Sequence, residues 1–331
     1  MIKVEHLTKR YGAFLAVDDL SFEIDAGGVY GFLGPNGAGK TTTMNIMTGC
    51  LSATGGSVTI GGHDVFEDAD AAKRLVGYLP EQPPLYMNET PAEYLRFVGE
   101  AKGLRGEVLT QQVAQALETV RMTEMAGRRT GDLSKGYKQR LGIAQALLGD
   151  PDLIILDEPT VGLDPIQITW IREMIQELGR THTVLLSSHI LSEVQAICDK
   201  ILIIAHGRLV AFDTPENLEA NLLAHGTLTL LADATPQAAR QTLAGCQSLR
   251  RVSAVDAPEE CFAAFELEAA VEDLYTAAWE VFFAFAERRL AILELSLHKA
   301  SLEDVFLELT ETAAEAPDAD KEEVDDHAGD L

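Results

Sequence analysis

Apolar residues along the chain, up to about residue 215, alternate between two spacings. Short apolar runs of strand length are followed by longer segments in which apolar residues recur at helical intervals. This alternation predicts an α/β domain. The predicted strands are Val17 to Ile24, Val29 to Leu33, Ser57 to Ile60, Val76 to Leu79, Leu153 to Asp157, Thr183 to Ser187, Lys200 to Ala205 and Leu209 to Asp213.

The stretch from Gln82 to Asp150 changes to a mostly helical pattern. Thr90-Pro91-Ala92-Glu93 is a capping box with proline at the first helical position. A second helix is expected over Val108 to Val120, and a third begins after Ser134 and stops at Gly149-Asp150-Pro151. We therefore expect a helical subdomain, at about residues 82–150, inserted into the α/β core of residues 1–215.

The rest of the chain predicts a second, smaller domain. A linker helix begins at Thr214-Pro215-Glu216 and covers 216–224. A β-α-β-β-α-β order follows, which is typical of a ferredoxin-like α+β domain and spans 225–310. Its strands are Thr227 to Ala232, Leu249 to Val255, Phe262 to Glu268 and Ala291 to Leu297, and its helices follow Thr235-Pro236 and cover Ala270 to Arg288. Ser301 caps a last helix that carries Val305, Phe306 and Leu309.

The charge and composition of the chain limit the classes of molecule that it can bind. The chain has 331 residues, 52 acidic and 26 basic, with a net charge of −26. Free nucleic acid and anionic lipid both need a cationic surface and are disfavoured. Residues 311–331 hold nine acids and one lysine, Lys321, so a disordered acidic tail is expected.

The cysteine spacing and the hydropathy of the chain indicate in which compartment the protein is found and whether it crosses a membrane. The four cysteines form no Cys-x-x-Cys pair, which favours a reduced cytosolic protein without a structural metal. The start of the chain shows no apolar signal core, and no apolar run approaches the ~20 residues of a membrane-spanning helix. If the protein moves something across a membrane, another subunit must supply the path.

Residues Gly34 to Thr41 read Gly-Pro-Asn-Gly-Ala-Gly-Lys-Thr, which fits the phosphate-loop pattern. Its glycines let backbone amides turn toward a triphosphate, Lys40 places a cation on the β- and γ-phosphates, and the Thr41 hydroxyl can bind Mg²⁺. A strand precedes the loop and a helix over Thr41 to Thr48 follows it. A glycine-rich turn without a ligand is the alternative.

Two further segments carry candidate chemistry. The apolar strand Leu153 to Leu156 ends in Asp157 and Glu158, where Asp157 would hold Mg²⁺ and Glu158 would orient or deprotonate the attacking water. A solvated strand exit is the alternative. Ser134-Lys135-Gly136 opens a helix and could bind an anion, or serve only as a cap.

The order of these motifs over residues 1–215 resembles the ATPase subunit of an ABC transporter. The resemblance implies a P-loop NTPase core with N-terminal antiparallel strands, and ATP and Mg²⁺ as ligands. It assigns catalysis to Glu158, His189 and Gln82, and the metal to Thr41, Gln82 and Asp157. The implied nucleotide-binding residues are Tyr11, Val17, Gly34, Pro35, Asn36, Gly37, Ala38, Gly39, Lys40, Thr41, Thr42, Ser134, Gly136 and Asp164.

Each of the single residues also has a structural interpretation. Tyr11 could be a surface aromatic, Gln82 a polar loop residue, Asp164 a helix cap and His189 a structural histidine. The segment at Ser134 departs from the usual Leu-Ser-Gly-Gly-Gln signature, because Lys135 and Tyr137 replace a glycine and the glutamine. This variant, with Ala300 to Phe306, resembles the subfamily that drives export of drugs, lipids, polysaccharides or ions.

The resemblance also implies partners. Each ATP would lie between Lys40 of one ATPase domain and Ser134 of another, so a homodimer or heterodimer is expected. A separate integral membrane permease would place the protein at the cytoplasmic face of the membrane. The alternative is a soluble ATPase switch of the same family that acts on a partner such as the ribosome. The second domain carries no titratable cluster and is expected to have an interaction or regulatory role.

Overall fold

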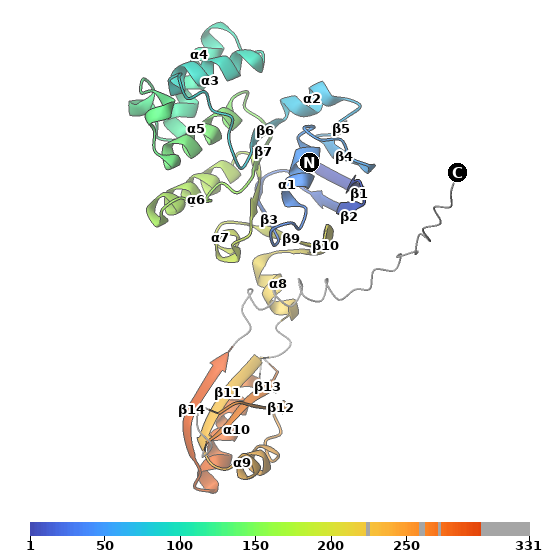
Figure 1. Cartoon of the computed structure of the whole chain (residues 1–331), viewed down its shortest axis with the longest axis vertical. Helices are drawn as coiled ribbons and strands as arrows, with labels where there is room; N and C mark the ends of the chain where they lie inside the picture. Colours follow the sequence, from blue (N-terminus) through green and yellow to red (C-terminus); the bar gives the residue numbers. More distant parts are fainter. Residues whose placement is uncertain (223–225, 258–261, 271–272, 299–331) are drawn as a thin grey trace, which may run out of the picture.

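The computed structural model describes residues 1–222, 226–257, 262–270 and 273–298. Two bodies are visible in Figure 1, with helix α8 (Pro215–Leu222) between them in the chain. The larger body holds two sheets and a group of helices, and the smaller holds one sheet and two helices. The helix predicted after Ser301 and the acidic tail lie outside the described residues.

The central sheet of the larger body has six strands in the order β10-β9-β3-β8-β7-β6. All neighbours are parallel except β10, which is antiparallel to β9. Parallel strands covered on both faces are apolar throughout, and the four residues of β7 are all buried. The strands are β3 (Gly28–Leu33), β6 (Val76–Leu79), β7 (Leu153–Leu156), β8 (Thr183–Ser188), β9 (Lys200–Ala205) and β10 (Arg208–Asp213).

A second, antiparallel sheet of four strands lies beside the central sheet, in the order β2-β1-β4-β5. Its strands are β1 (Ile2–Tyr11), β2 (Phe14–Ile24), β4 (Gly55–Ile60) and β5 (His63–Asp64). Helix α1 (Lys40–Met47) shares one buried cluster with both sheets, in which Met44 packs with Phe22 and Phe32. This cluster fixes the start of α1 beside the end of β3.

Three helices form the inserted helical part, α3 (Pro91–Ala101), α4 (Gly106–Thr119) and α5 (Lys135–Leu147), with two short 3-10 turns, η1 (Thr123–Met125) and η2 (Thr130–Asp132). The predicted capping box is present, because Thr90 Oγ1 accepts from the Glu93 amide at 3.3 Å and Glu93 Oε2 accepts from the Thr90 amide at 2.9 Å. Helices α2 (Ala69–Arg74), α6 (Pro165–Gly179) and α7 (Leu191–Gln195) complete the body.

Lys102, which follows the last residue of α3, forms a side-chain hydrogen bond with the backbone at the end of α5. Its Nζ donates to the carbonyl of Leu148 at 2.6 Å, beside the carbonyls that end α5. A cation at a helix C-terminus satisfies carbonyl groups that have no partner within the helix. We predict that Lys102→Ala lowers the free energy of unfolding by about 1 kcal/mol. Chemical denaturation measures this, and Arg96→Ala, an exposed change on α3, should leave the free energy unchanged within error.

The smaller body is a four-stranded antiparallel sheet in the order β12-β13-β11-β14, with two helices on one face. Its elements are β11 (Gly226–Asp233), α9 (Pro236–Leu243), β12 (Leu249–Val255), β13 (Ala263–Ala269), α10 (Leu274–Glu287) and β14 (Ala291–His298). This β-α-β-β-α-β order and strand arrangement are those of a ferredoxin-like fold, which confirms the predicted class.

Candidate functional site

The phosphate loop lies between β3 and α1, where the sequence predicts it. Gly37 and Gly39 have φ values of 83° and 100°, in the left-handed region that favours glycine. Gly34 is fixed for another reason, because a Cβ there would lie 2.4 Å from the carbonyl oxygen of Ile204. The loop therefore turns tightly and directs the backbone toward the start of α1.

Lys40, the first residue of α1, is buried and forms hydrogen bonds with the backbone of the phosphate loop. Its Nζ donates to the carbonyl oxygens of Gly34 at 2.7 Å and Pro35 at 3.2 Å, and lies 3.7 Å from Glu158 Oε1. Burial lowers the pKa of the Lys40 ammonium, and the carboxylates of Glu158 and Asp157 oppose this effect. A cation in this position faces any phosphate that enters the loop.

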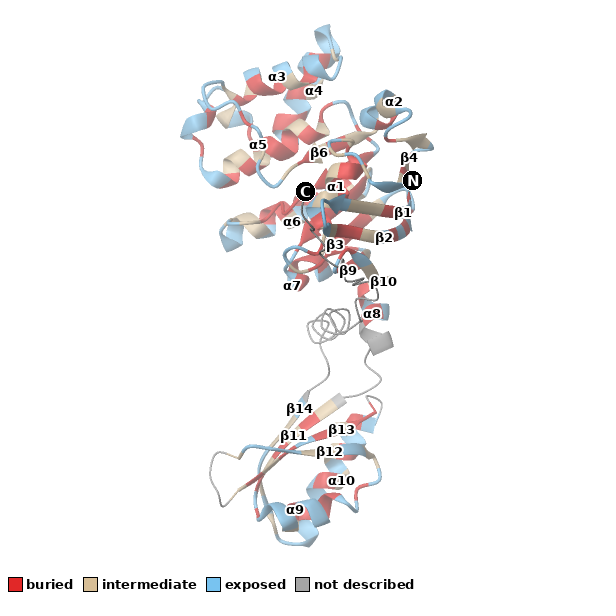
Figure 2. Cartoon of the chain, turned by 45° about the vertical axis from the view of Figure 1, so that its right-hand side comes forward, coloured by how far each residue is buried: buried red, intermediate tan, exposed pale blue. Residues whose placement is uncertain are grey.

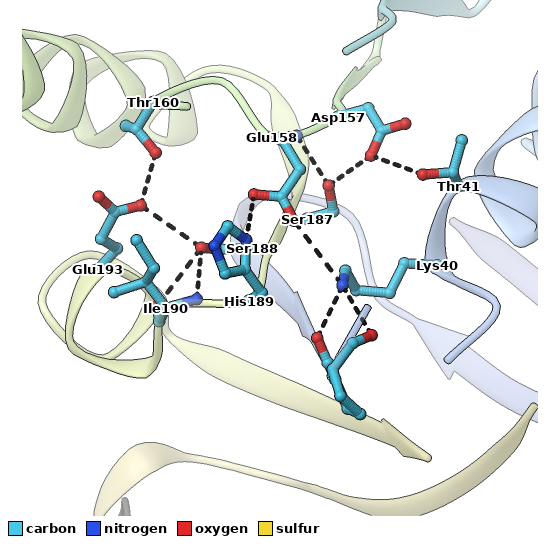
Figure 3. A network of polar contacts seen from close by, with 12 residues as sticks. Lys40, Thr41, Asp157, Glu158, Thr160, Ser187, Ser188, His189, Ile190 and Glu193 are labelled. Carbon is cyan, nitrogen blue, oxygen red and sulfur yellow. Dashed lines mark hydrogen bonds and ion pairs between the residues drawn. The ribbon is translucent and has the colours of Figure 1, made fainter. Parts of the chain in front are cut away.

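Asp157 and Glu158 follow β7 directly and point into the same region, as Figure 3 shows. Ser187, at the end of the neighbouring strand β8, contacts both: its Oγ donates to Asp157 Oδ1 at 2.6 Å and accepts from the Glu158 amide at 2.8 Å. Thr41 Oγ1 lies 3.4 Å from the same Asp157 oxygen. One serine therefore sets the positions of both acids beside the phosphate loop.

His189 completes the group around Glu158. Its Nδ1 lies 3.0 Å from Glu158 Oε2. Since a carboxylate only accepts, Nδ1 is the donor in this contact. Glu158 itself has a φ of 48°, an uncommon backbone conformation for a residue other than glycine. Such conformations persist where surrounding contacts fix them, and they are concentrated at functional sites.

Behind this group lies a buried network centred on Glu193 of α7. Glu193 Oε2 accepts from Thr160 Oγ1 at 2.5 Å and lies 3.4 Å from Ser188 Oγ, while Oε1 lies 3.8 Å from Arg172. Thr160 follows Glu158 by two residues, and Ser188 precedes His189 (Figure 3). Glu193 therefore ties together the two backbone segments that carry the acid and the histidine.

The phosphate loop and these side chains border a cavity of about 520 Å³. A volume of this size is typical of small-molecule sites. Ten of the predicted site residues line it: Tyr11, Asn36, Gly37, Ala38, Gly39, Lys40, Thr41, Thr42, Glu158 and His189. Tyr11 is 49% exposed, as a side chain that stacks on a ligand must be before the ligand binds.

Other predicted residues lie outside that lining. Val17 is fully buried, and its neighbour Ala16 lines the cavity instead. Gln82 is exposed, and its neighbour Glu81 lines the cavity. Pro35 offers its carbonyl to Lys40.

Ser134, Gly136 and Asp164 gather at a different place, where α5 and α6 begin. Ser134 Oγ accepts from the Tyr137 amide at 3.4 Å, and Asp164 Oδ1 accepts from the Gln167 amide at 2.9 Å, so both are helix caps. A Cβ on Gly136 would lie 2.5 Å from the Gln167 side chain, which shows how closely the two helix starts pack. Within one chain, these residues do not line the cavity that holds Lys40.

The oxygen atoms at the phosphate loop suit a divalent cation. Asp157 Oδ2 is buried and has no hydrogen-bond partner among the residues that the structure describes, although its other oxygen has two. An unsatisfied buried carboxylate oxygen is costly unless a ligand compensates it. Thr41 Oγ1 lies 3.4 Å from Oδ1 of the same carboxylate, and Mg²⁺ prefers such oxygen ligands. The donor set therefore fits the cation.

Sequence reasoning missed Phe14, Glu81, Ser187 and Glu193. Phe14 is 62% exposed and lines the cavity, and an aromatic residue three positions after Tyr11 is a signal that the sequence does contain. Ser187 and Glu193 carry no comparable local signal.

For the ATP hydrolysis that the sequence predicts, we expect Glu193→Ala to lower kcat by about tenfold and to leave the Kd for ATP unchanged. The substitution releases Thr160 and Ser188, so the segments of Glu158 and His189 lose their support, and small displacements of reacting groups are costly. Glu193 does not line the cavity, so ATP contacts remain. Steady-state hydrolysis and a nucleotide-binding titration separate the two effects. Glu173→Ala, an exposed change near Arg172, is the control; a kcat loss equal to that of Glu193→Ala would contradict the prediction.

Comparison with known proteins gives consistent matches. The ABC transporter family model matches residues 17–161. The linearmycin resistance ATP-binding protein LnrL of Bacillus subtilis (strain 168) is 34% identical over 316 residues, which cover 94% of this chain and 98% of that protein. The bacitracin transport ATP-binding protein BcrA of Bacillus licheniformis is 41% identical over 212 residues, which cover 63% of this chain and 68% of that protein.

Solved structures agree with these relatives. An ATP-binding subunit of an ABC transporter superposes with a TM-score of 0.61 at 32% identity and covers 67% of this chain and 92% of that one. In the described residues, no helix has the length and apolar character needed to cross a membrane. The family match contains the phosphate loop and the Asp157–Glu158 pair, and the alignment with LnrL extends over both bodies. The chain therefore belongs to the ATP-binding proteins of ABC transporters and is an ATPase.

Proposed function

We propose that this chain hydrolyses ATP to drive export of a substrate through a separate membrane subunit. The observation that carries the proposal is the convergence of Lys40, Glu158 and His189 on one cavity beside the phosphate loop, with Asp157 buried next to them against Thr41. The relatives act in linearmycin resistance and bacitracin transport, so an antimicrobial compound is the substrate class to test first.

The site residues take distinct roles in this proposal. Lys40 and the amides of Gly37 to Thr42 bind the phosphates, and Tyr11 stacks on the adenine. Glu158 accepts a proton from the attacking water, and His189 positions Glu158 and contacts the γ-phosphate. Thr41, Asp157 and Gln82 would hold Mg²⁺, which supplies charge neutralisation of the phosphates. Removal of divalent cations with EDTA should then stop hydrolysis.

The protein acts as a dimer of ATPase domains in this proposal. Ser134, Gly136 and Asp164 lie away from the cavity of their own chain, at the exposed starts of α5 and α6. A second ATPase domain placed head to tail would bring these residues to the γ-phosphate. Lys135 lies against Gly162 at this place, because a Cβ on Gly162 would be 2.0 Å from Lys135 Nζ. In the dimer, Lys135 would therefore add a positive charge near the γ-phosphate.

We also propose the domain limits 1–215, 216–224 and 225–310, with residues 311–331 as a tail. Separate buried clusters support them: two clusters draw on residues up to Leu218, and the third uses only residues from Leu228 onward. The ATPase domain would sit at the cytoplasmic face of the membrane, in contact with the membrane subunit.

Affinity purification of the tagged full chain from solubilised membranes tests the proposal. We expect a polytopic membrane protein to co-purify and to stimulate ATP hydrolysis after reconstitution. Recovery of ribosomal proteins instead, with no membrane protein, would favour a soluble ATPase switch and contradict the transport role.

A further inference from the structure

Helices α5 and α6 lie next to each other in the larger body (Figure 2). Gly136 on α5 packs against Gln167 on α6. One turn further along each helix, Arg140 on α5 lies against Trp170 on α6. The two pairings advance in the same direction on both helices, so the two helix starts lie together. The helical insert supplies one helix of this pair, and the α/β core supplies the other.

The contact between Arg140 and Trp170 is a cation–π stack. Arg140 Cζ lies 3.7 Å from the centroid of the Trp170 ring and 5.3 Å from that of Tyr137, one turn earlier on α5. The end of α4 reaches the same indole, because Arg121 Cζ lies 5.6 Å from its centroid. Trp170 is only 9% exposed, and burial lowers the pKa of the Arg140 guanidinium. A cation is held more strongly over an indole ring where water is excluded.

The stack is the specific contact between the two helices. In the part of the chain that the structure describes, no hydrogen bond or ion pair joins α5 to α6, and Arg140 forms neither with any residue. Polar side chains of the two helices bond elsewhere, with Gln145 on the carbonyl of Tyr78 and Gln176 on that of Ala196. Both helices also present the positive ends of their dipoles at the shared start, and like ends repel. Apolar packing and the stack therefore keep the two starts together.

We propose that Arg140 is a positioning residue, which fixes the starts of α5 and α6 relative to each other through its stack on Trp170. The inference rests on the proposed function, because only a dimer bridged by ATP gives the two starts a common ligand. In that dimer, Ser134 and Gly136 of α5 and Asp164 of α6 must reach the nucleotide of the second ATPase domain together.

The departure of this chain from the usual signature supports the stack. Tyr137, which stands where the signature has glutamine, packs against the buried cluster that contains Trp170. Its ring gives the Arg140 guanidinium a second aromatic contact, which a glutamine side chain cannot supply.

Loss of the stack should affect the dimer and not the binding of ATP by one chain. Arg140 and Trp170 do not line the cavity that holds Lys40, so the contacts of one chain with its own nucleotide remain. Hydrogen bonds to the opposite nucleotide weaken steeply once their geometry departs from ideal values. A symmetric dimer contains the stack twice. A loss of about threefold at each stack, the size of a partly exposed cation–π contact, gives about tenfold for the dimer.

The test uses the full chain with Glu158→Gln as parent, so that hydrolysis does not consume the ATP. Analytical ultracentrifugation with saturating ATP and Mg²⁺ measures the dimer Kd. Arg140→Gln and Trp170→Leu should each raise it by about tenfold, and the two together should raise it no further, because both remove one contact. Trp170→Phe keeps a ring face and should stay within about threefold of the parent. The Kd for ATP, titrated at chain concentrations below the dimer Kd, should be equal in all of them.

Two controls separate positioning from stability. Arg180→Gln removes an equal charge at the end of α6, where Arg180 pairs with Glu177, and should leave the dimer Kd unchanged. Met174→Ala removes buried apolar packing from α6 and should lower the thermal midpoint with less than a threefold change in the dimer Kd. An unchanged dimer Kd for Arg140→Gln, or an equal rise for Met174→Ala, would overturn the positioning role.

The parent distinguishes this inference from the proposed function. A parent that stays monomeric with saturating ATP would contradict the proposed dimer, and the inference with it. A parent that dimerises with the same Kd when the stack is lost would overturn the inference alone.

Discussion

Glu158→Gln is expected to lower the rate of ATP hydrolysis by about 10²- to 10⁴-fold, the usual contribution of a positioned general base. Glutamine keeps the shape of the side chain and cannot accept a proton. The backbone contact of residue 158 with Ser187 is retained, because it uses the amide rather than the side chain. Phosphate release at saturating ATP measures the loss.

The same variant should bind ATP at least as tightly as the native protein. The ion pair between Lys40 and Glu158 at 3.7 Å disappears, so Lys40 becomes more available to phosphates. We therefore expect an ATP-bound dimer that persists long enough to be isolated by size-exclusion chromatography. Glu81→Gln, a change of another acid that lines the cavity, is the control and should hydrolyse ATP within a few-fold of the native rate. A native rate for Glu158→Gln would remove Glu158 from the base role.

Lys40→Ala should weaken ATP binding by about 10- to 100-fold, since a hydrogen bond to a charged group contributes ~1.5–3 kcal/mol. The loss has two causes. The phosphates lose their cation, and the carboxylates of Asp157 and Glu158 remain in the site without a positive charge beside them. Titration with a fluorescent ATP analogue measures the Kd.

The control for this variant is Lys138→Ala, whose ammonium contacts the carbonyl of Gly131 and does not line the cavity. It removes an equal charge and should leave the Kd for ATP unchanged. An equal Kd for native protein and Lys40→Ala would contradict the placement of the triphosphate in the loop.

The sequence was enough to predict those parts of the site whose geometry is set by residues adjacent in the chain. The phosphate loop between β3 and α1 is one such part, because its turn needs glycines at fixed positions and its lysine begins the helix. The acids at the end of β7 are another, since an apolar strand that ends in Asp157 and Glu158 indicates the second half of a nucleotide site when a phosphate loop with Lys40 is present in the same chain.

The supporting contacts depend on how strands pair, and the sequence does not specify that pairing locally. Ser187 reaches both acids because β8 lies parallel to β7 with Leu186 beside Leu156. Glu193 joins two loops only after α7 folds onto the same edge of the sheet. Strand β1 was absent from the predicted strands because Glu5-His6 and Thr8 to Arg10 interrupt its apolar pattern. The exposure of Tyr275, Trp279, Phe282 and Phe283 on α10 could not be predicted, because an apolar residue gives the same sequence pattern whether it is buried in a core or exposed.

The two sets of contacts that Lys40 makes separate the binding of phosphate from its hydrolysis. Lys40 Nζ donates to the carbonyl oxygens of Gly34 and Pro35, and these contacts do not involve Glu158. Glu158 in turn is positioned by His189 Nδ1 at 3.0 Å and by its own amide on Ser187. Each residue therefore keeps its place when the other is replaced, so the two substitutions should produce separable defects.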